Sequence, residues 1–89
     1  MNQYELLRAV ADTCRDLVTD AESAIMTCTG YEDATLIGSM QTHQLIGLRR
    51  LMLPLAESLG AVSVAESIFD RYLCQLEAVK AESRHLLRG

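Results

Sequence analysis

Apolar residues recur along this chain at spacings of three and four, which is the period of an amphipathic α-helix. Three segments carry the pattern, at about residues 3–29, 34–59 and 64–87. No segment alternates apolar and polar residues for long enough to predict a strand. Because short connections place neighbouring helices in opposite directions, the pattern predicts an all-α antiparallel three-helix bundle that occupies residues 1–89 as a single helical domain.

The first segment begins with Asn2 followed three residues later by Glu5, which has the form of a capping box. Gly30 is expected to end this helix and Asp33 to cap the next one. The predicted buried stripe comprises Tyr4, Leu7, Ala11, Cys14, Val18, Ala21, Ile25 and Cys28, widened by Leu6, Val10, Leu17 and Ala24.

The third segment has similar signals at its start. Gly60 is expected to end the second helix, and Ser63 with Glu66 forms a second candidate capping box. The predicted buried stripe of the third helix comprises Ala65, Phe69, Tyr72, Leu76, Val79, Ser83 and Leu86.

The middle segment is apolar over a wide arc and contains Pro54. Proline removes a backbone hydrogen bond within a helix, so Pro54 either bends this helix or opens a separate short one. The apolar arc expected to face the other two helices comprises Ile37, Met40, Leu48, Leu51, Met52, Leu55 and Leu59, with Leu45 at its edge.

Two apolar residues of the middle segment, Ile46 and Leu53, fall on the opposite, polar arc, seven residues apart. Two apolar side chains one above the other on a polar face are typical of an interface. The alternatives are chance exposure and burial by a third helix that wraps further around the second than expected. The candidate partner or dimer interface comprises His43, Ile46, Gly47, Arg50, Leu53 and Glu57. Long helices around a small core favour association, so we expect a homodimer.

Composition limits the classes of partner. The chain has 89 residues, 49% of them hydrophobic, and 8 basic against 12 acidic side chains give a formal charge of −4. An acidic chain without a basic cluster is not expected to bind nucleic acid or an anionic membrane surface. The sequence shows no apolar run of membrane-spanning length and no signal peptide.

The three cysteines, Cys14, Cys28 and Cys74, lack a paired short spacing, so neither a disulfide framework nor a zinc site is expected. We expect them to be packing residues in a protein of the reducing cytoplasm.

No catalytic constellation, cofactor motif or metal-ligand spacing is present in the sequence, so no enzyme activity is expected. The segment Thr42-His43-Gln44-Leu45-Ile46-Gly47 resembles the signature of histidine-phosphotransfer domains, helical bundles that carry a phosphoryl group on an exposed imidazole. That resemblance implies a phosphorelay role for His43, although Ile46 stands where the family has a lysine. The sequence favours a small acidic protein that regulates, inhibits or antagonises another protein by binding it, with the phosphorelay module as the alternative.

Overall fold

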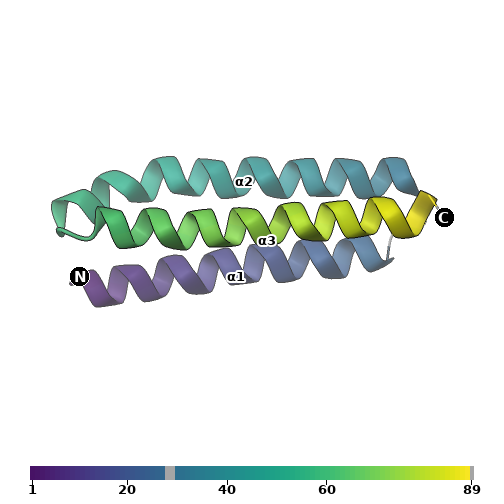
Figure 1. The fold of residues 1–89 in the computed structure, drawn as a ribbon. Helices are drawn as coiled ribbons and strands as arrows, with labels where there is room; N and C mark the ends of the chain where they lie inside the picture. Colours follow the sequence, from purple (N-terminus) through teal and green to yellow (C-terminus); the bar gives the residue numbers. More distant parts are fainter. Residues whose placement is uncertain (28–29, 89) are drawn as a thin grey trace.

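The computed structural model describes residues 1–27 and 30–88, with side chains described except at positions 31, 32 and 83–88. This part of the chain forms three helices, α1 (Gln3–Thr27), α2 (Tyr31–Ser58) and α3 (Val62–Arg88). Figure 1 shows them side by side along one long axis, and the principal extents are 46 × 16 × 15 Å. No strand occurs within the described ranges, so the predicted all-helical class and the three-helix count are confirmed.

The start of α1 shows the Asn2 half of the predicted capping box. The Asn2 Oδ1 atom accepts a hydrogen bond from the backbone N–H of Glu5 at 2.9 Å, and the Asn2 carbonyl accepts one from Leu6 at 3.1 Å. The side chain therefore satisfies a backbone donor that has no partner within the helix. The predicted end of this helix at residue 29, and the predicted packing of Cys28, lie outside the described residues.

Helix α2 begins three residues earlier than the sequence pattern predicts. Gly30 is its N-cap, with an extended backbone (φ −141°, ψ 153°), and the Gly30 carbonyl accepts a hydrogen bond from Ala34 N at 3.1 Å. The prediction that Asp33 caps the second helix is therefore wrong, whereas the predicted stop of the first helix at Gly30 depends on residues 28–29, which lie outside the described residues. Asp33 lies in the first turn, where its carboxylate interacts favourably with the partial positive charge of the helix N-terminus.

The predicted stop at Gly60 is confirmed. Gly60 has φ +72°, its N–H donates to the Glu57 carbonyl at 3.0 Å, and the Ala61 N–H donates to the Ala56 carbonyl at 2.8 Å. This pair of bonds is a Schellman motif, which needs a left-handed residue at the glycine position.

The capping box predicted at Ser63 and Glu66 is wrong. Helix α3 begins at Val62, and the Ala61 carbonyl accepts the hydrogen bond from Ala65 N at 3.0 Å. The tight turn after α2 places Ala61 directly at the entry to α3, so Ser63 falls inside the helix. There its carbonyl accepts a bond from the Ser67 hydroxyl at 3.1 Å.

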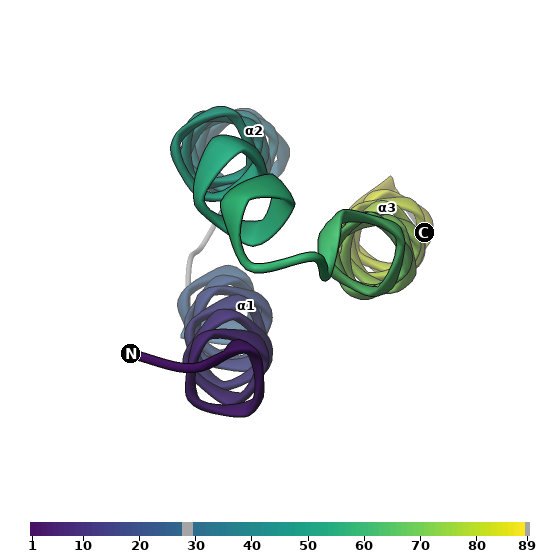
Figure 2. The same cartoon turned by 90° about the vertical axis from the view of Figure 1, so that its left-hand side faces the viewer.

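Pro54 lies inside a continuous helix, because α2 runs on to Ser58. The alternative of a separate short helix that starts at Pro54 is therefore wrong. Figure 2 shows the last turns of α2 displaced toward the space between α1 and α3. Ala56 lies in this stretch and is fully buried. Proline has no N–H group, so the Arg50 carbonyl lacks its usual helical donor and a bend is expected at Pro54. The displaced turns that follow Pro54 are the ones that pack closely against the other two helices.

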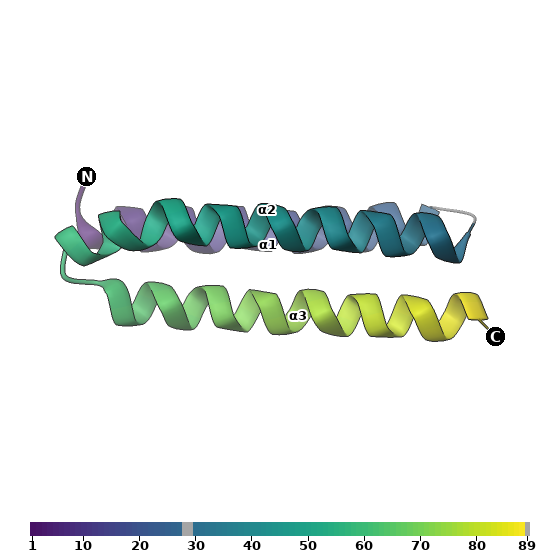
Figure 3. The ribbon, with the colours of Figure 1, turned by 90° about the horizontal axis from the view of Figure 1, so that it is seen from above.

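The core lies along the axis between the three helices, each of which contacts the other two (Figure 2). Seen from above, α3 runs beside the other two helices over the length of the rod (Figure 3). The largest fully buried side chains are Phe69, Leu45, Leu76 and Cys14. The core cluster comprises Leu6, Val10, Cys14, Val18, Ala21, Leu45, Ala56, Ala65, Phe69 and Leu76.

The predicted stripes of α1 and α3 agree with this core in large part. Tyr4 is the exception on α1, because it is 75% exposed, and the buried direction passes through Leu6 and Val10 instead. On α3, the fully buried residues are Ala65, Phe69 and Leu76. Tyr72 and Val79 are partly buried and pack against the core beside them. The side chains of Ser83 and Leu86 lie outside the described part.

The predicted orientation of α2 is wrong at several positions. Leu45, expected at the edge, is fully buried, whereas Met40, Leu51 and Leu55 are 53%, 69% and 50% exposed. The members of the predicted arc that do pack against the core are Leu48, Met52 and Leu59. The buried side of α2 carries Ala34, Gly38 and Ala56, and small side chains let the neighbouring helices approach closely.

The cysteines divide into two environments. Cys14 is fully buried, and burial raises the pKa of its thiol from 9.0 to about 11, because the thiolate would lose its hydration. Cys74 is exposed on α3, so the expectation that it is a packing residue is wrong. The apolar stripe of α3 passes through Leu73 and Leu76, which turns Cys74 toward solvent.

Candidate interaction surface

The residues predicted to form an interface all lie on α2, but they do not all face solvent. His43, Gly47, Arg50 and Glu57 are exposed, and Ile46 is partly buried. Leu53 packs against the core, so its apolar side chain already has partners within the chain. Leu53 follows Thr42 by eleven residues, about three helical turns, and Thr42 is hydrogen-bonded to α3. It therefore lies on the side of α2 that faces α3.

A different apolar surface of α2 is open to solvent, and sequence reasoning missed it. Four of the eight large hydrophobic side chains that are exposed in the described residues belong to α2. At 100° per residue they fall within an arc of about 100°, which also contains the exposed Asp33, Gln44, Gly47, Pro54 and Ser58. We call the four large apolar side chains and the two residues between them on this arc the outer row, and it comprises Leu36, Met40, Gln44, Gly47, Leu51 and Leu55.

The outer row lies on the far side of α2 from its small buried residues. Leu36 is 61% exposed, and the three other large side chains of the row are at least half exposed. A helix that is apolar around most of its circumference is normally covered on both sides. The signal that could have located this face is the spacing of Ala34, Gly38, Leu45 and Ala56, in which three small residues mark the contact side.

The two helical glycines of α2 have opposite surroundings. A Cβ atom at Gly38 would lie 2.8 Å from Cγ of Lys80, so Gly38 is required by the packing of α3. A Cβ atom at Gly47 would have no heavy atom within 4 Å. Glycine costs helix stability relative to alanine, and nothing in the bundle compensates for that cost at Gly47.

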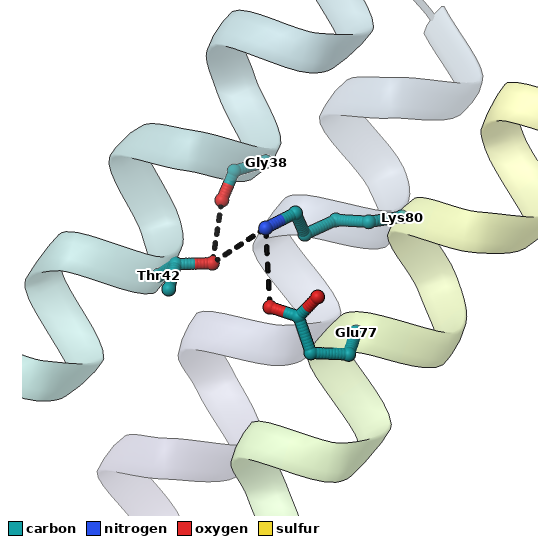
Figure 4. Close-up of polar contacts among 4 residues, drawn as sticks. All are labelled: Gly38, Thr42, Glu77 and Lys80. Atoms are coloured by element: carbon teal, nitrogen blue, oxygen red, sulfur yellow. Dashed lines mark hydrogen bonds and ion pairs between the residues drawn. The ribbon is translucent and has the colours of Figure 1, made fainter.

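A connected group of polar side chains joins α2 to α3 (Figure 4). The Thr42 hydroxyl donates to the Gly38 carbonyl at 2.9 Å and accepts a hydrogen bond from Lys80 Nζ at 3.2 Å. Lys80 Nζ also pairs with Glu77 Oε1 at 3.1 Å. The Lys80 side chain is 22% exposed and lies across Gly38.

This group has the chemistry of a structural link between helices. The Lys80 ammonium donates to the Thr42 oxygen, so it cannot accept the hydroxyl proton and activate Thr42 as a nucleophile. The hydroxyl proton is directed at the Gly38 carbonyl. The arrangement therefore positions α3 against α2 and supplies no general base.

Formal charge is unevenly distributed over the helices. Helix α1 carries five carboxylates and two arginines, and one pair, Asp12 with Arg15, forms an exposed ion pair at 3.1 Å. The outer row of α2 carries no charged side chain. A partner that covers this row meets an apolar surface, whereas a partner along α1 meets an acidic one.

The described residues contain no group of three or more His, Cys, Asp or Glu side chains that could hold a metal ion. Within the same residues, no helix combines the length and apolar character that crossing a membrane requires. No protein-family model, curated protein or solved structure was found to match the chain.

Proposed function

We propose that this chain is a small acidic interaction protein, not an enzyme, that regulates, inhibits or antagonises another protein by binding it through α2. The observation that carries the proposal is the outer row, with four large apolar side chains at least half exposed on one helix face. Several large apolar side chains exposed on one helix face of a small domain favour a binding site over chance exposure.

The residues predicted from the sequence border this surface. His43, Gly47 and Arg50 are exposed beside or within the outer row, where they give the apolar surface a polar rim. An apolar centre with a polar rim is the usual composition of a protein interface. We take the bundle as antiparallel and the protein as cytoplasmic and dimeric, with neither nucleic acid nor membrane among its partners.

The experiment is affinity capture from the cells that produce the protein, with three baits compared by quantitative mass spectrometry. The wild-type bait and Val64→Glu should retain the same partner, because Val64 is an exposed apolar residue of α3 outside the outer row. Leu51→Glu should lose that partner. Equal recovery with all three baits would contradict binding through α2.

A second candidate function, phosphorelay through His43, rests on one observation. His43 is exposed, and Gly47 lies one turn later with open space beside it, so a partner domain could approach the imidazole. Incubation with a phosphorylated receiver domain should then label the wild-type protein and Arg50→Ala, but not His43→Ala. Absence of acid-labile label on the wild-type protein would exclude this function.

A further inference from the structure

We infer that the outer row of α2 is the interface with a second copy of this chain, which packs its own α2 antiparallel across a twofold axis between Gln44 and Gly47. The inference rests on the proposed binding role of α2 and names one occupant of that face.

The spacing of the outer row is the same in both directions along the helix. Its six members are separated by 4, 4, 3, 4 and 4 residues. A twofold axis at the centre, perpendicular to α2, therefore brings Leu36 of one chain to Leu55 of the other, and Met40 to Leu51. An isologous interface requires this self-complementarity, because each residue of the patch must meet a residue of the same patch.

Gly47 has a function in such a dimer that it lacks within a single chain. It lies next to the twofold axis, opposite Gln44 of the second copy. A residue without a side chain at the crossing point lets two helices approach closely, and the space above Gly47 is empty in the single chain. The open space beside Gly47 is therefore compatible with the axis that the symmetric spacing indicates.

Charge and area agree with a second copy as the occupant. Two chains of formal charge −4 repel each other, and the uncharged outer row keeps the acidic face of α1 out of the contact. A compact monomer of this mass exposes about 5,200 Å², whereas this chain exposes 5835 Å². The four large side chains leave on the order of 400 Å² open, about half of the ~800 Å² per partner in a standard interface. The remainder must come from flanking α2 residues, so we expect a weak dimer.

The first measurement is the mass in solution by sedimentation equilibrium, from micromolar to millimolar concentration. The wild-type protein and Val64→Glu should approach twice the chain mass as concentration rises. Leu51→Glu should remain a monomer with unchanged helical circular dichroism, because Leu51 is 69% exposed and its replacement leaves the core intact. A wild-type monomer at millimolar concentration would overturn the inference.

Disulfide trapping then tests the register. In a background with Cys28→Ser and Cys74→Ser, a mixture of Met40→Cys and Leu51→Cys chains should form a covalent dimer under mild oxidation. Either variant alone should not, because two copies of residue 40, or two of residue 51, lie about 16 Å apart along the helix. A disulfide needs Cα atoms within about 7 Å. Efficient trapping of Met40→Cys alone would contradict the antiparallel arrangement.

These measurements use the purified chain, so they separate the two proposals. A wild-type monomer overturns the dimer even when capture shows that Leu51→Glu loses a partner. Trapped antiparallel dimers support the inference even when all three baits recover the same proteins, which would remove only the proposed binding of another protein.

Discussion

The chemical behaviour of a cysteine side chain in this protein depends on how much water reaches it. Cys14 and Cys74 are both cysteines on helices, yet one is fully buried at the centre of the rod and the other is exposed. The buried thiol loses hydration of its charged form, whereas the exposed one keeps it. This contrast gives two measurable differences.

The first difference is chemical reactivity. In a Cys28→Ser background at pH 8, a thiol reagent should modify one cysteine per chain quickly, and mass spectrometry should locate it at Cys74. Cys14 should react only after denaturation, because it is buried and its pKa of about 11 leaves little thiolate. Rapid native modification of both thiols would show that Cys14 is not in the core.

The second difference is the dependence of stability on alkaline pH. The folded thiol of Cys14 has a pKa of about 11, against 9.0 for an unperturbed thiol. Between these values the unfolded chain releases a proton that the folded chain keeps, so stability falls as pH rises from 9 to 11 and is unaffected below 9.

The loss should reach about 2–3 kcal/mol at 1.36 kcal/mol per pKa unit. Urea unfolding of wild type and Cys14→Ala across this range should show the extra decline in the wild type only. Parallel curves would contradict the assignment to Cys14.

Among the three helices, α2 has apolar side chains on both its buried side and its exposed side. One side packs on α1 and α3 through small residues and Leu45, and the other presents the outer row to solvent. Leucines of α2 that look equivalent in the sequence therefore contribute very differently to the free energy of unfolding.

Leu45→Ala and Leu51→Ala should separate these sides. Leu45 is fully buried, so its truncation leaves a cavity and should cost about 2–5 kcal/mol of unfolding free energy. Leu51 is 69% exposed, and its truncation should change stability by no more than about 0.5 kcal/mol. Denaturant titration at a concentration low enough to avoid association compares them directly. A larger loss for Leu51→Ala than for Leu45→Ala would instead support the orientation predicted from the sequence.

The two glycines of α2 provide a second pair. Gly47→Ala should stabilise the monomer by up to about 1 kcal/mol, because alanine favours the helix and meets open space. At Gly38→Ala the new methyl group overlaps the stem of Lys80, and overpacking costs about 1–3 kcal/mol. In thermal unfolding, the Tm of Gly47→Ala should therefore be higher than that of wild type, and the Tm of Gly38→Ala should be lower. A stabilised Gly38→Ala would mean that Lys80 moves aside freely.

The whole molecule is a thin rod, and its shape follows from three long helices around one narrow core. The Cα radius of gyration is 14.4 Å, whereas a compact chain of 89 residues has about 12 Å. An elongated shape buries less surface per residue and leaves more helix surface for association.

Small-angle scattering tests this shape. The Leu51→Glu variant, chosen to suppress association, should give a radius of gyration near 14.4 Å when extrapolated to zero concentration. A value near 12 Å would indicate shorter helices folded into a more compact bundle.

The sequence by itself determined the number, type and approximate bounds of the helices. Periodic apolar residues, the Asn2 cap and the left-handed Gly60 are local signals whose physics lies within a few residues. The core faces of α1 and α3 were largely predictable for a related reason. Their apolar residues cluster on one side, so the buried direction is defined before any partner helix is placed.

Only the tertiary structure decided which face of α2 is buried. Its apolar residues surround much of the helix, so periodicity defines no single direction, and the close approach of α1 and α3 selects the side of Ala34, Gly38 and Ala56. The same choice packs Leu53 against the core and turns Leu51 to solvent. Contacts between helices distant in sequence set these environments, and for that reason the large apolar side chains that α2 exposes are not those of the predicted stripe.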